Sequence, residues 1–312
     1  MMNERFLLSL RLILSHVILL PLLILISLFT CNVLFLLITV SQTVLLILLF
    51  SGYWEFLGSR FKRIYFTSSE LWILIVFFMK LSSGNKADNS LCLVLLLAAI
   101  QAWLLFLFLK MLIVIYKTEK GAVEIVFPFK QGKYLITDGG NSRISRLMNY
   151  HFYSPVHKKK KTNLSMLYAT DIVKIKNSGI NYLPPRNIDY PIFGEKVYSP
   201  VSGIVVKVED GINDNVPYCG NYPYNTGNTI VIRQGENYLL LGHLKMDSIR
   251  VKTGDVISAD DLIAEAGNSG YSERPHIHMQ LIHSLTDNFW TGTGVSIQFK
   301  KKNLYKNRLI EV

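Results

Sequence analysis

Six of the seven histidines follow residue 150, and their spacing suggests chemistry. His276 and His278 lie two apart at the start of a strand-like run, where side chains two apart point to the same face of a sheet. Two imidazoles on one face can form half of a metal site, or one can bind a metal beside a catalytic neighbour. A single His-x-His pair is common by chance, so the assignment of a metal site needs support from other segments of the chain.

Five short motifs occur in a fixed order along the second half of the chain: Val197–Val205, Gly242–Leu244, Val251–Ile257, Gly267–Gly270 and Pro275–His278. Together they resemble the lysostaphin-like (LytM-type) zinc metallopeptidases, over roughly Ile125–Ser284. In that family a His and an Asp from one strand region hold zinc together with the second His of His-x-His, and a water fills the fourth position. The resemblance implies that His278 is a zinc ligand and that His276 and His243 are the catalytic histidines.

The first half of the implied site departs from the family pattern, which is a His followed four positions later by an Asp. Asp171 suits the acid, but Leu167 stands four positions before it. Asp189 is a second candidate for the acid, and Pro185 stands four positions before that residue. Neither acid therefore has its histidine at the usual spacing.

A subgroup of these enzymes takes its first ligand from an upstream Asn-x-His segment and its acid from a Tyr-Ala-x-Asp segment. Asn149-Tyr150-His151 and the segment ending in Asp171 resemble these two segments. We therefore expect His151 and Asp171 to complete the metal site, with His157 as the alternative first ligand. The simpler alternatives are a loop histidine at position 151 and a turn or strand-end carboxylate at position 171.

The implied residues form a chemically coherent site. Two histidines and an aspartate with one open position describe a catalytic rather than a structural zinc site. Zinc polarises a carbonyl and lowers the pKa of its water towards ~7, and a neighbouring histidine can then move a proton or stabilise an oxyanion. We expect one Zn²⁺ per chain and hydrolysis of peptide bonds in peptidoglycan cross-bridges or stem peptides. Cys219 has no obvious base near it in the sequence, and His283 is expected at the surface.

Two other function classes remain to be weighed against the peptidase. The displaced first ligand favours a catalytically impaired LytM-like domain that regulates or binds. A biotinyl- or lipoyl-like carrier is suggested by Gly203–Val205 and Gly254–Val256, but the chain lacks the lysine at an exposed hairpin tip that such a carrier needs.

The soluble part of the chain is predicted to be all-β, an antiparallel sandwich or barrel without long amphipathic helices past residue 120. Short runs rich in Val, Ile and Tyr alternate with Gly, Asp, Asn and Pro about every ten residues. The predicted strands are Ala122–Phe127, Lys133–Ile136, Lys196–Tyr198, Gly203–Val208, Thr229–Ile232, Tyr238–Leu241, Ile249–Val251, Leu262–Ala266 and Ile277–Ile282. The polar and aromatic segment Gly211–Gly227 is expected to form one wall of a substrate groove.

The first third of the chain predicts a membrane region. The 312 residues are 50% hydrophobic and only 18% charged, with a mean hydropathy of +0.29, which excludes a wholly soluble protein. About four transmembrane helices are expected in residues 1–117, followed by a LytM-like domain over 118–312. The candidate spans are Phe6–Phe29, Val33–Phe50, Leu71–Met79 and Leu91–Tyr116. Gln101 within the last span is expected to hydrogen-bond to another helix.

The side of the membrane on which the β-domain lies depends on the number of transmembrane helices. Arg5, Arg11 and the loop Arg60–Arg63 place the N-terminus and that loop in the cytoplasm by the positive-inside rule. Four crossings then put the β-domain in the cytoplasm and three put it outside, and a peptidoglycan substrate requires the outside. We expect a multi-pass protein of the cell membrane with an extracytoplasmic catalytic domain. Its partners are the lipid bilayer and a peptide or peptidoglycan substrate rather than nucleic acid, although the net charge of +11 alone does not choose among them. The oligomeric state stays open.

Overall fold

A computed structural model describes residues 91–153, 162–175, 184–219 and 225–312, together with single helical positions at 36, 39, 40, 43, 44 and 47. Apart from those single positions, the predicted spans Phe6–Phe29, Val33–Phe50 and Leu71–Met79 lie outside the described residues, as does His157. The chain divides into two compact units, one containing Met1–Leu112 and Ser178–Leu183 and the other Ile113–Asn177 and Pro184–Val312.

Helix α4 spans Leu91–Tyr116, as the sequence predicts. Its 26 residues at 1.5 Å each give a length of about 39 Å, enough to cross a bilayer. Within the described part of the chain, Leu95–Tyr116 is the one helix long and apolar enough to span a membrane, so the other predicted spans are not established. Within the same unit, Gln101 Nε2 donates to Thr43 Oγ1 at 2.9 Å, the kind of interhelical bond expected for Gln101.

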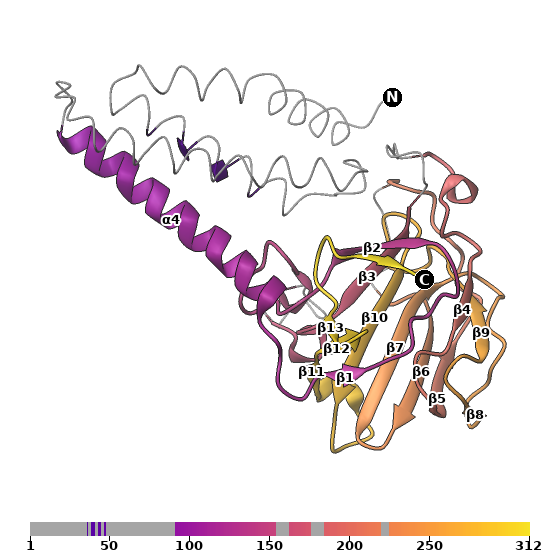
Figure 1. Ribbon diagram of the computed structural model, residues 1–312. Coiled ribbons are helices and arrows are strands. Elements are labelled where there is room, and N and C mark those ends of the chain that lie inside the picture. The colour runs from indigo at the N-terminus through magenta and orange to yellow at the C-terminus, as the bar shows by residue number, and fades with distance from the viewer. Residues whose placement is uncertain are drawn as a thin grey trace. The chain divides into compact units, whose positions relative to one another are not determined.

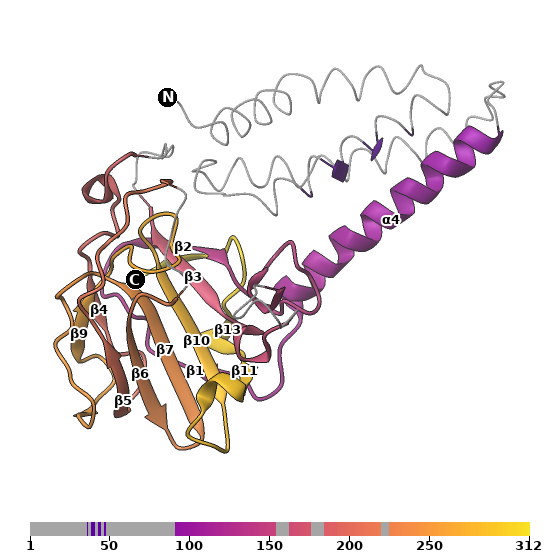
Figure 2. The same cartoon turned by 180° about the vertical axis from the view of Figure 1, so that it is seen from behind.

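The second unit is all-β, as predicted, and most of its strands form one nine-stranded sheet (Figures 1 and 2). Eight strands follow the order β14-β2-β3-β10-β7-β6-β5-β8, and β11 pairs with β10. All these pairs are antiparallel, and within the described residues the order runs from β14 to β8 without closing into a barrel. The bounds are β2 Lys133–Asp138, β3 Thr170–Lys174, β5 Gly203–Glu209, β6 Asn228–Gln234, β7 Asn237–Leu244, β8 Val256–Ile257, β10 Ile277–His283, β11 Thr293–Val295 and β14 Leu309–Glu311.

Two small sheets accompany the large one. Strands β4 (Lys196–Tyr198) and β9 (Leu262–Glu265) form an antiparallel pair. Strands β1 (Val123–Glu124), β12 (Ile297–Phe299) and β13 (Lys302–Asn303) form the other sheet, and its β1–β12 pair is parallel, contrary to the purely antiparallel prediction. One apolar cluster joins side chains from the small sheets and the large sheet. This shared core fixes the sheet that carries the histidines.

Some strand predictions were wrong. Ile249–Val251 is not a strand. A single backbone bond, from Arg250 N to Ile263 O of β9 at 2.9 Å, joins this segment to its neighbour, and one bond does not make a ladder. Strand β3 was not among the predicted strands, since its second residue is Asp171 and aspartate is depleted in strands. Past residue 120 the described helices are 3₁₀ segments of three residues each, which agrees with the absence of long helices.

The register at the middle of the large sheet brings the chemically interesting residues together. Strand β10 lies between β3 and β7, and His278 is the register partner of Asp171 on one side and of Gly242 on the other. Because His243 follows Gly242, three neighbouring strands supply a carboxylate and two imidazoles at one level of the sheet. Ile277, between His276 and His278, is fully buried in the apolar core on the opposite face.

Candidate metal centre

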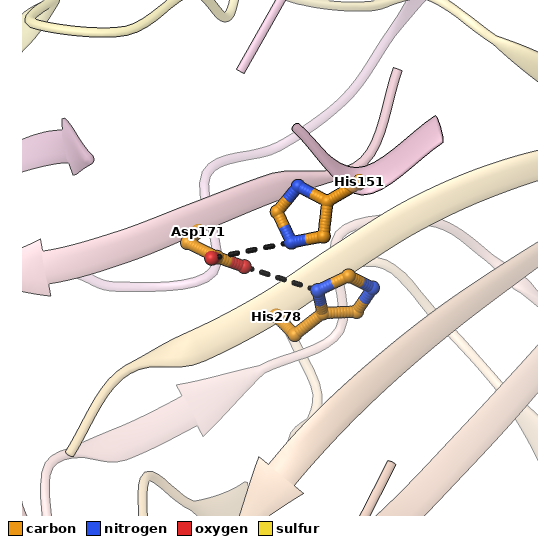
Figure 3. A group of neighbouring side chains, drawn as sticks. All are labelled: His151, Asp171 and His278. Atoms are coloured by element: carbon orange, nitrogen blue, oxygen red, sulfur yellow. Dashed lines mark hydrogen bonds and ion pairs between the residues drawn. The ribbon is translucent and has the colours of Figure 1, made fainter. Parts of the chain in front are cut away.

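His151, Asp171 and His278 meet in a buried cluster (Figure 3). His278 Nδ1 lies 3.0 Å from Asp171 Oδ1, and His151 Nε2 lies 3.3 Å from Asp171 Oδ2. Asp171 projects from β3 and His278 from β10, whereas His151 begins a one-turn 3₁₀ helix, His151–Tyr153, in the long connection between β2 and β3. One potential ligand atom from each residue lies within 4.8 Å of the others.

The chemistry of this cluster suits a zinc ion. Two imidazoles and one carboxylate are the donor types that zinc takes in catalytic sites. Burial acts to raise the pKa of Asp171, but the facing His151 and His276 outweigh it and hold that pKa well below its usual range. The carboxylate is therefore ionised, as a metal ligand must be. Burial acts to lower the pKa of His151, and the Asp171 charge reverses this and raises it.

His276 and His243 lie beside the cluster. His276 Nε2 is 3.7 Å from Asp171 Oδ1, and the ring centroids of His243 and His276 are 4.7 Å apart. His243 has a backbone φ of +59°, a conformation that non-glycine residues seldom adopt and that must be held by its surroundings. Its backbone amide donates to Thr226 O at 2.8 Å, and its carbonyl accepts from Gly267 N at 3.0 Å.

Both of these histidines have a defined tautomer. A carbonyl oxygen can only accept, so His243 Nδ1 must donate to Ser269 O at 2.8 Å, and His276 Nδ1 must donate to Arg274 O at 2.8 Å. In the neutral rings Nε2 therefore carries the lone pair. Burial lowers the pKa of His243 well below its usual range and also lowers that of His276. Both rings are neutral near pH 7 and can each accept a proton.

The loop that holds His243 depends on two glycines in close approach. Gly227 and Gly270 have φ of +66° and +71°, and a Cβ on Gly270 would overlap the backbone of Gly227. This contact allows Ser269 Oγ to accept from Asn228 N at 2.9 Å and to donate to Leu244 O at 2.7 Å. Ser269 is thereby fixed with its carbonyl against His243.

The predicted groove segment is tied to the loop that carries His276. Asn215 Nδ2 donates to Gly270 O at 2.6 Å and to Ser272 O at 3.1 Å. Ser272 Oγ is 3.1 Å from His276 Nδ1. Part of Gly211–Gly227 lies outside the described residues, so its role as a groove wall stays a prediction.

The other candidate residues lie elsewhere. Asp189, the alternative acid, pairs with Arg186 through contacts of 2.9 and 3.0 Å and takes no part in the cluster. His283 is exposed at the end of β10, 3.8 Å from Glu236 Oε2, in agreement with the surface position expected for it. Cys219 is an exposed free thiol.

The sequence analysis gave no role to four buried polar residues near the cluster. Asn149 Oδ1 lies 2.8 Å from His151 Nδ1, and Gln280 Oε1 lies 3.0 Å from His278 Nε2. Gln280 follows the same alternation along β10 as His276 and His278, so its position was available from the sequence. Asp138, the register partner of Asp171 on β2, accepts from Lys306 Nζ at 3.3 Å, and no local pattern connects those two residues.

Comparisons with known proteins bear on this domain. Residues 186–289 match the model of Peptidase family M23. The peptidoglycan DD-endopeptidase ShyA of Vibrio cholerae serotype O1 is 33% identical over 100 residues, which are 32% of this chain and 20% of that protein. Endolysin 2638A of Staphylococcus phage 2638A is 33% identical over 116 residues, 34% of this chain and 23% of that protein. A solved zinc-containing peptidase from Vibrio cholerae gives a TM-score of 0.32 at 23% identity, covering 54% of this chain and 37% of that one.

The segment 186–289 is therefore similar to an M23-type peptidase domain, and the two curated relatives that match it are named as a peptidoglycan DD-endopeptidase and an endolysin. The matched segments make up 20% and 23% of those two curated relatives. The family match includes His243, His276 and His278 but begins after His151 and Asp171. The family match therefore does not cover the first half of the cluster.

Proposed function

We propose that this protein is a membrane-anchored zinc endopeptidase that cleaves peptide bonds in peptidoglycan. Zinc would be held by His151, Asp171 and His278, with His243 and His276 as catalytic residues. The observation that carries the proposal is the convergence of these three ligands from separate segments into one buried cluster within an M23-type domain.

When bound, zinc supplies a Lewis acid that polarises the scissile carbonyl and lowers the pKa of water. Asp171 brings the one negative charge of the ligand set, and its low pKa keeps that charge at neutral pH. His243 and His276 are neutral, with Nδ1 donating to the backbone, so their Nε2 atoms can take a proton from the attacking water. The protonated ring can then donate to the oxyanion or to the departing amine. The fixed carbonyls of Ser269 and Arg274 keep both rings oriented through this exchange.

Helix α4 supports the membrane anchor, and we propose a multi-pass protein whose β-domain lies outside the cytoplasmic membrane. Peptidoglycan is found there, and a domain on the cytoplasmic side would not meet it. Protease added to intact cells should digest the β-domain while leaving a cytoplasmic marker whole. Protection of the β-domain until the membrane is opened would contradict a peptidoglycan substrate.

The zinc and the activity are tested on the purified full chain in detergent. Metal analysis should find one zinc per chain, and peptidoglycan fragments incubated with the protein should show cleaved cross-bridge or stem peptides. His278→Ala should lose both the zinc and the cleavage. His283→Ala is the matched control, because it removes an exposed histidine from the same strand and should leave both unchanged.

The competing function is an M23-type domain that regulates or binds without catalysis. The displaced first ligand favoured it, and the contact of His151 with Asp171 weakens it, since the His–Asp pair is restored in space. A wild-type chain that holds no zinc and cleaves no peptidoglycan fragment would favour this alternative and refute the peptidase.

A further inference from the structure

We propose that Asn149 and Gln280 are positioning residues that determine which ring nitrogen each zinc-binding histidine presents. Asn149 makes His151 present Nε2, and Gln280 makes His278 present Nδ1. The inference rests on the proposed zinc site and goes beyond it by assigning the ligand atoms and the residues that select them. Both side-chain amides are in fully buried residues.

The amide of Asn149 can have only one orientation. Its Nδ2 donates to Gly140 O at 2.7 Å and to Ala169 O at 2.9 Å. Because both partners are carbonyl oxygens, exchanging Oδ1 and Nδ2 would place acceptor against acceptor at both contacts. Oδ1 therefore faces His151, where it accepts from the backbone N at 3.2 Å and lies 2.8 Å from Nδ1.

This orientation defines the tautomer of His151. A carbonyl-type oxygen at 2.8 Å requires a hydrogen on Nδ1, so in the neutral ring Nε2 carries the lone pair. Nε2 lies 3.3 Å from Asp171 Oδ2, which is also an acceptor. Two buried acceptors this close repel each other unless a proton or a metal ion lies between them. When zinc takes the place of that proton, Nε2 and a carboxylate oxygen face one common ion.

Gln280 acts on His278 in the opposite sense. Its Oε1 is 3.0 Å from His278 Nε2, and a hydrogen on that nitrogen leaves Nδ1 as the lone-pair atom, 3.0 Å from Asp171 Oδ1. Among the described residues, Gln280 Nε2 has no hydrogen-bond partner. The contact of this amide with His278 is thus made by Oε1 alone, and a carboxylate oxygen could make the same contact. Asn149, by contrast, needs both its oxygen and its NH₂ group.

Asn149 and Gln280 together determine which ring nitrogens of His151 and His278 face Asp171. The ring atoms that face Asp171 are Nε2 of His151, 3.3 Å from Oδ2, and Nδ1 of His278, 3.0 Å from Oδ1, so these are the atoms whose lone pairs an ion at Asp171 would meet. A ring in the wrong tautomer would direct an N–H at the ion. Hydrogen-bonding partners of this kind typically change metal affinity by about 10–100-fold when they are removed.

The test compares zinc affinity in two variants of Gln280, measured on the full chain in detergent by competition with a fluorescent chelator. Gln280→Leu should weaken zinc binding on the order of 10–100-fold, whereas Gln280→Glu keeps an acceptor and should stay close to wild type. Gln234→Leu, an exposed strand glutamine, is the matched control. Equal zinc affinity of Gln280→Leu and wild type would overturn the role of Gln280.

The ligand atoms are read directly by nuclear magnetic resonance. In zinc-loaded protein labelled with ¹⁵N-histidine, long-range ¹H–¹⁵N spectra separate a metal-bound nitrogen from an N–H nitrogen in each ring. We expect zinc on Nε2 of His151 and on Nδ1 of His278, and Asn149→Ala should weaken zinc binding and disperse the His151 signal. Zinc bound through the other nitrogen of either ring would overturn the inference and leave the proposed function standing. A wild-type chain that binds no zinc would instead refute the proposed function itself.

Discussion

Lys306 forms a buried ion pair with Asp138, the register partner of Asp171, and replacing it tests how that pair stabilises the domain around the cluster. It lies beyond the family match, which ends at residue 289, and its Nζ donates to Asp138 Oδ1 at 3.3 Å. Only 7% of the Lys306 side chain and 9% of the Asp138 side chain are exposed. Lys306→Met keeps the apolar length of the side chain and removes its charge, which leaves a buried carboxylate beside Asp171 without its cation.

The expected loss of stability follows from that burial. Removing one partner of a buried ion pair typically costs about 3–5 kcal/mol. For a domain of this size each kcal/mol corresponds to about 2–4 °C in melting temperature, so Lys306→Met should melt about 6–20 °C lower. The control is Lys207→Met, which breaks the pair with Glu209 at 3.1 Å. That distance is similar, but the two side chains are 39% and 41% exposed, and the loss should stay below about 1 kcal/mol.

The pH dependence separates this charge effect from simple loss of packing. Burial already raises the pKa of Asp138 against the opposing influence of Lys306, and Lys306→Met should raise it further. A folded-state pKa above the unfolded one means that stability falls as pH rises through the interval between them. The deficit of Lys306→Met should therefore grow with rising pH.

Thermal unfolding of the full chain in detergent, with zinc in excess and followed by near-ultraviolet circular dichroism, measures these differences. The double variant Asp138→Asn with Lys306→Met lacks both charges, so it should recover most of the lost stability and show no such pH dependence. Equal melting temperatures of Lys306→Met and Lys207→Met would refute the reasoning from buried charge. So would a double variant that is as unstable as Lys306→Met.

Three further outcomes are expected. Zinc at a hundred times its dissociation constant should stabilise the wild-type domain by about 2.7 kcal/mol and leave the melting temperature of His278→Ala unchanged; an equal rise in both would argue against this site. With zinc saturating, kcat should stay constant as pH falls through about 6.5, the ordinary pKa of histidine, because the pKa values of His243 and His276 are lowered. A loss of kcat centred at that pH would contradict their assignment as the catalytic histidines. Gly270→Ala should destabilise the domain by about 1–3 kcal/mol and reduce cleavage by displacing Ser269, as unfolding curves and kcat would reveal.

The sequence was most informative where one periodicity governs both structure and chemistry. Strand alternation placed His276 and His278 on one face with Ile277 in the core, and the structure has this arrangement. The same alternation extends to Gln280. Regular apolar content likewise predicted α4 with its observed bounds. In these places each residue is positioned by its immediate neighbours, so local reasoning suffices.

Local reasoning failed where a buried polar group is stabilised by partners that are distant in the sequence. Asp171 resembles a turn residue by propensity, yet it is the second residue of β3, where histidines from two other segments contact its carboxylate. Asp138 and Lys306 are 168 positions apart and show no pattern that connects them. Ile249–Val251 shows the opposite error, since its β-forming residues make a single backbone bond to β9 and form no ladder.

The position of His151 explains why motif spacing could not identify the first ligand with certainty. The chain leaves the large sheet at Asp138, the end of β2, and returns at Thr170, the start of β3, so the two ends of this excursion lie side by side. Asn149 donates to Gly140 O near one end and to Ala169 O at the other, and its Oδ1 holds His151. The distance from His151 to Asp171 is set by these bonds, whatever the number of residues between them. The family's four-residue spacing is therefore one way to bring a histidine to the carboxylate, and a buried asparagine that joins both ends of a longer loop is another.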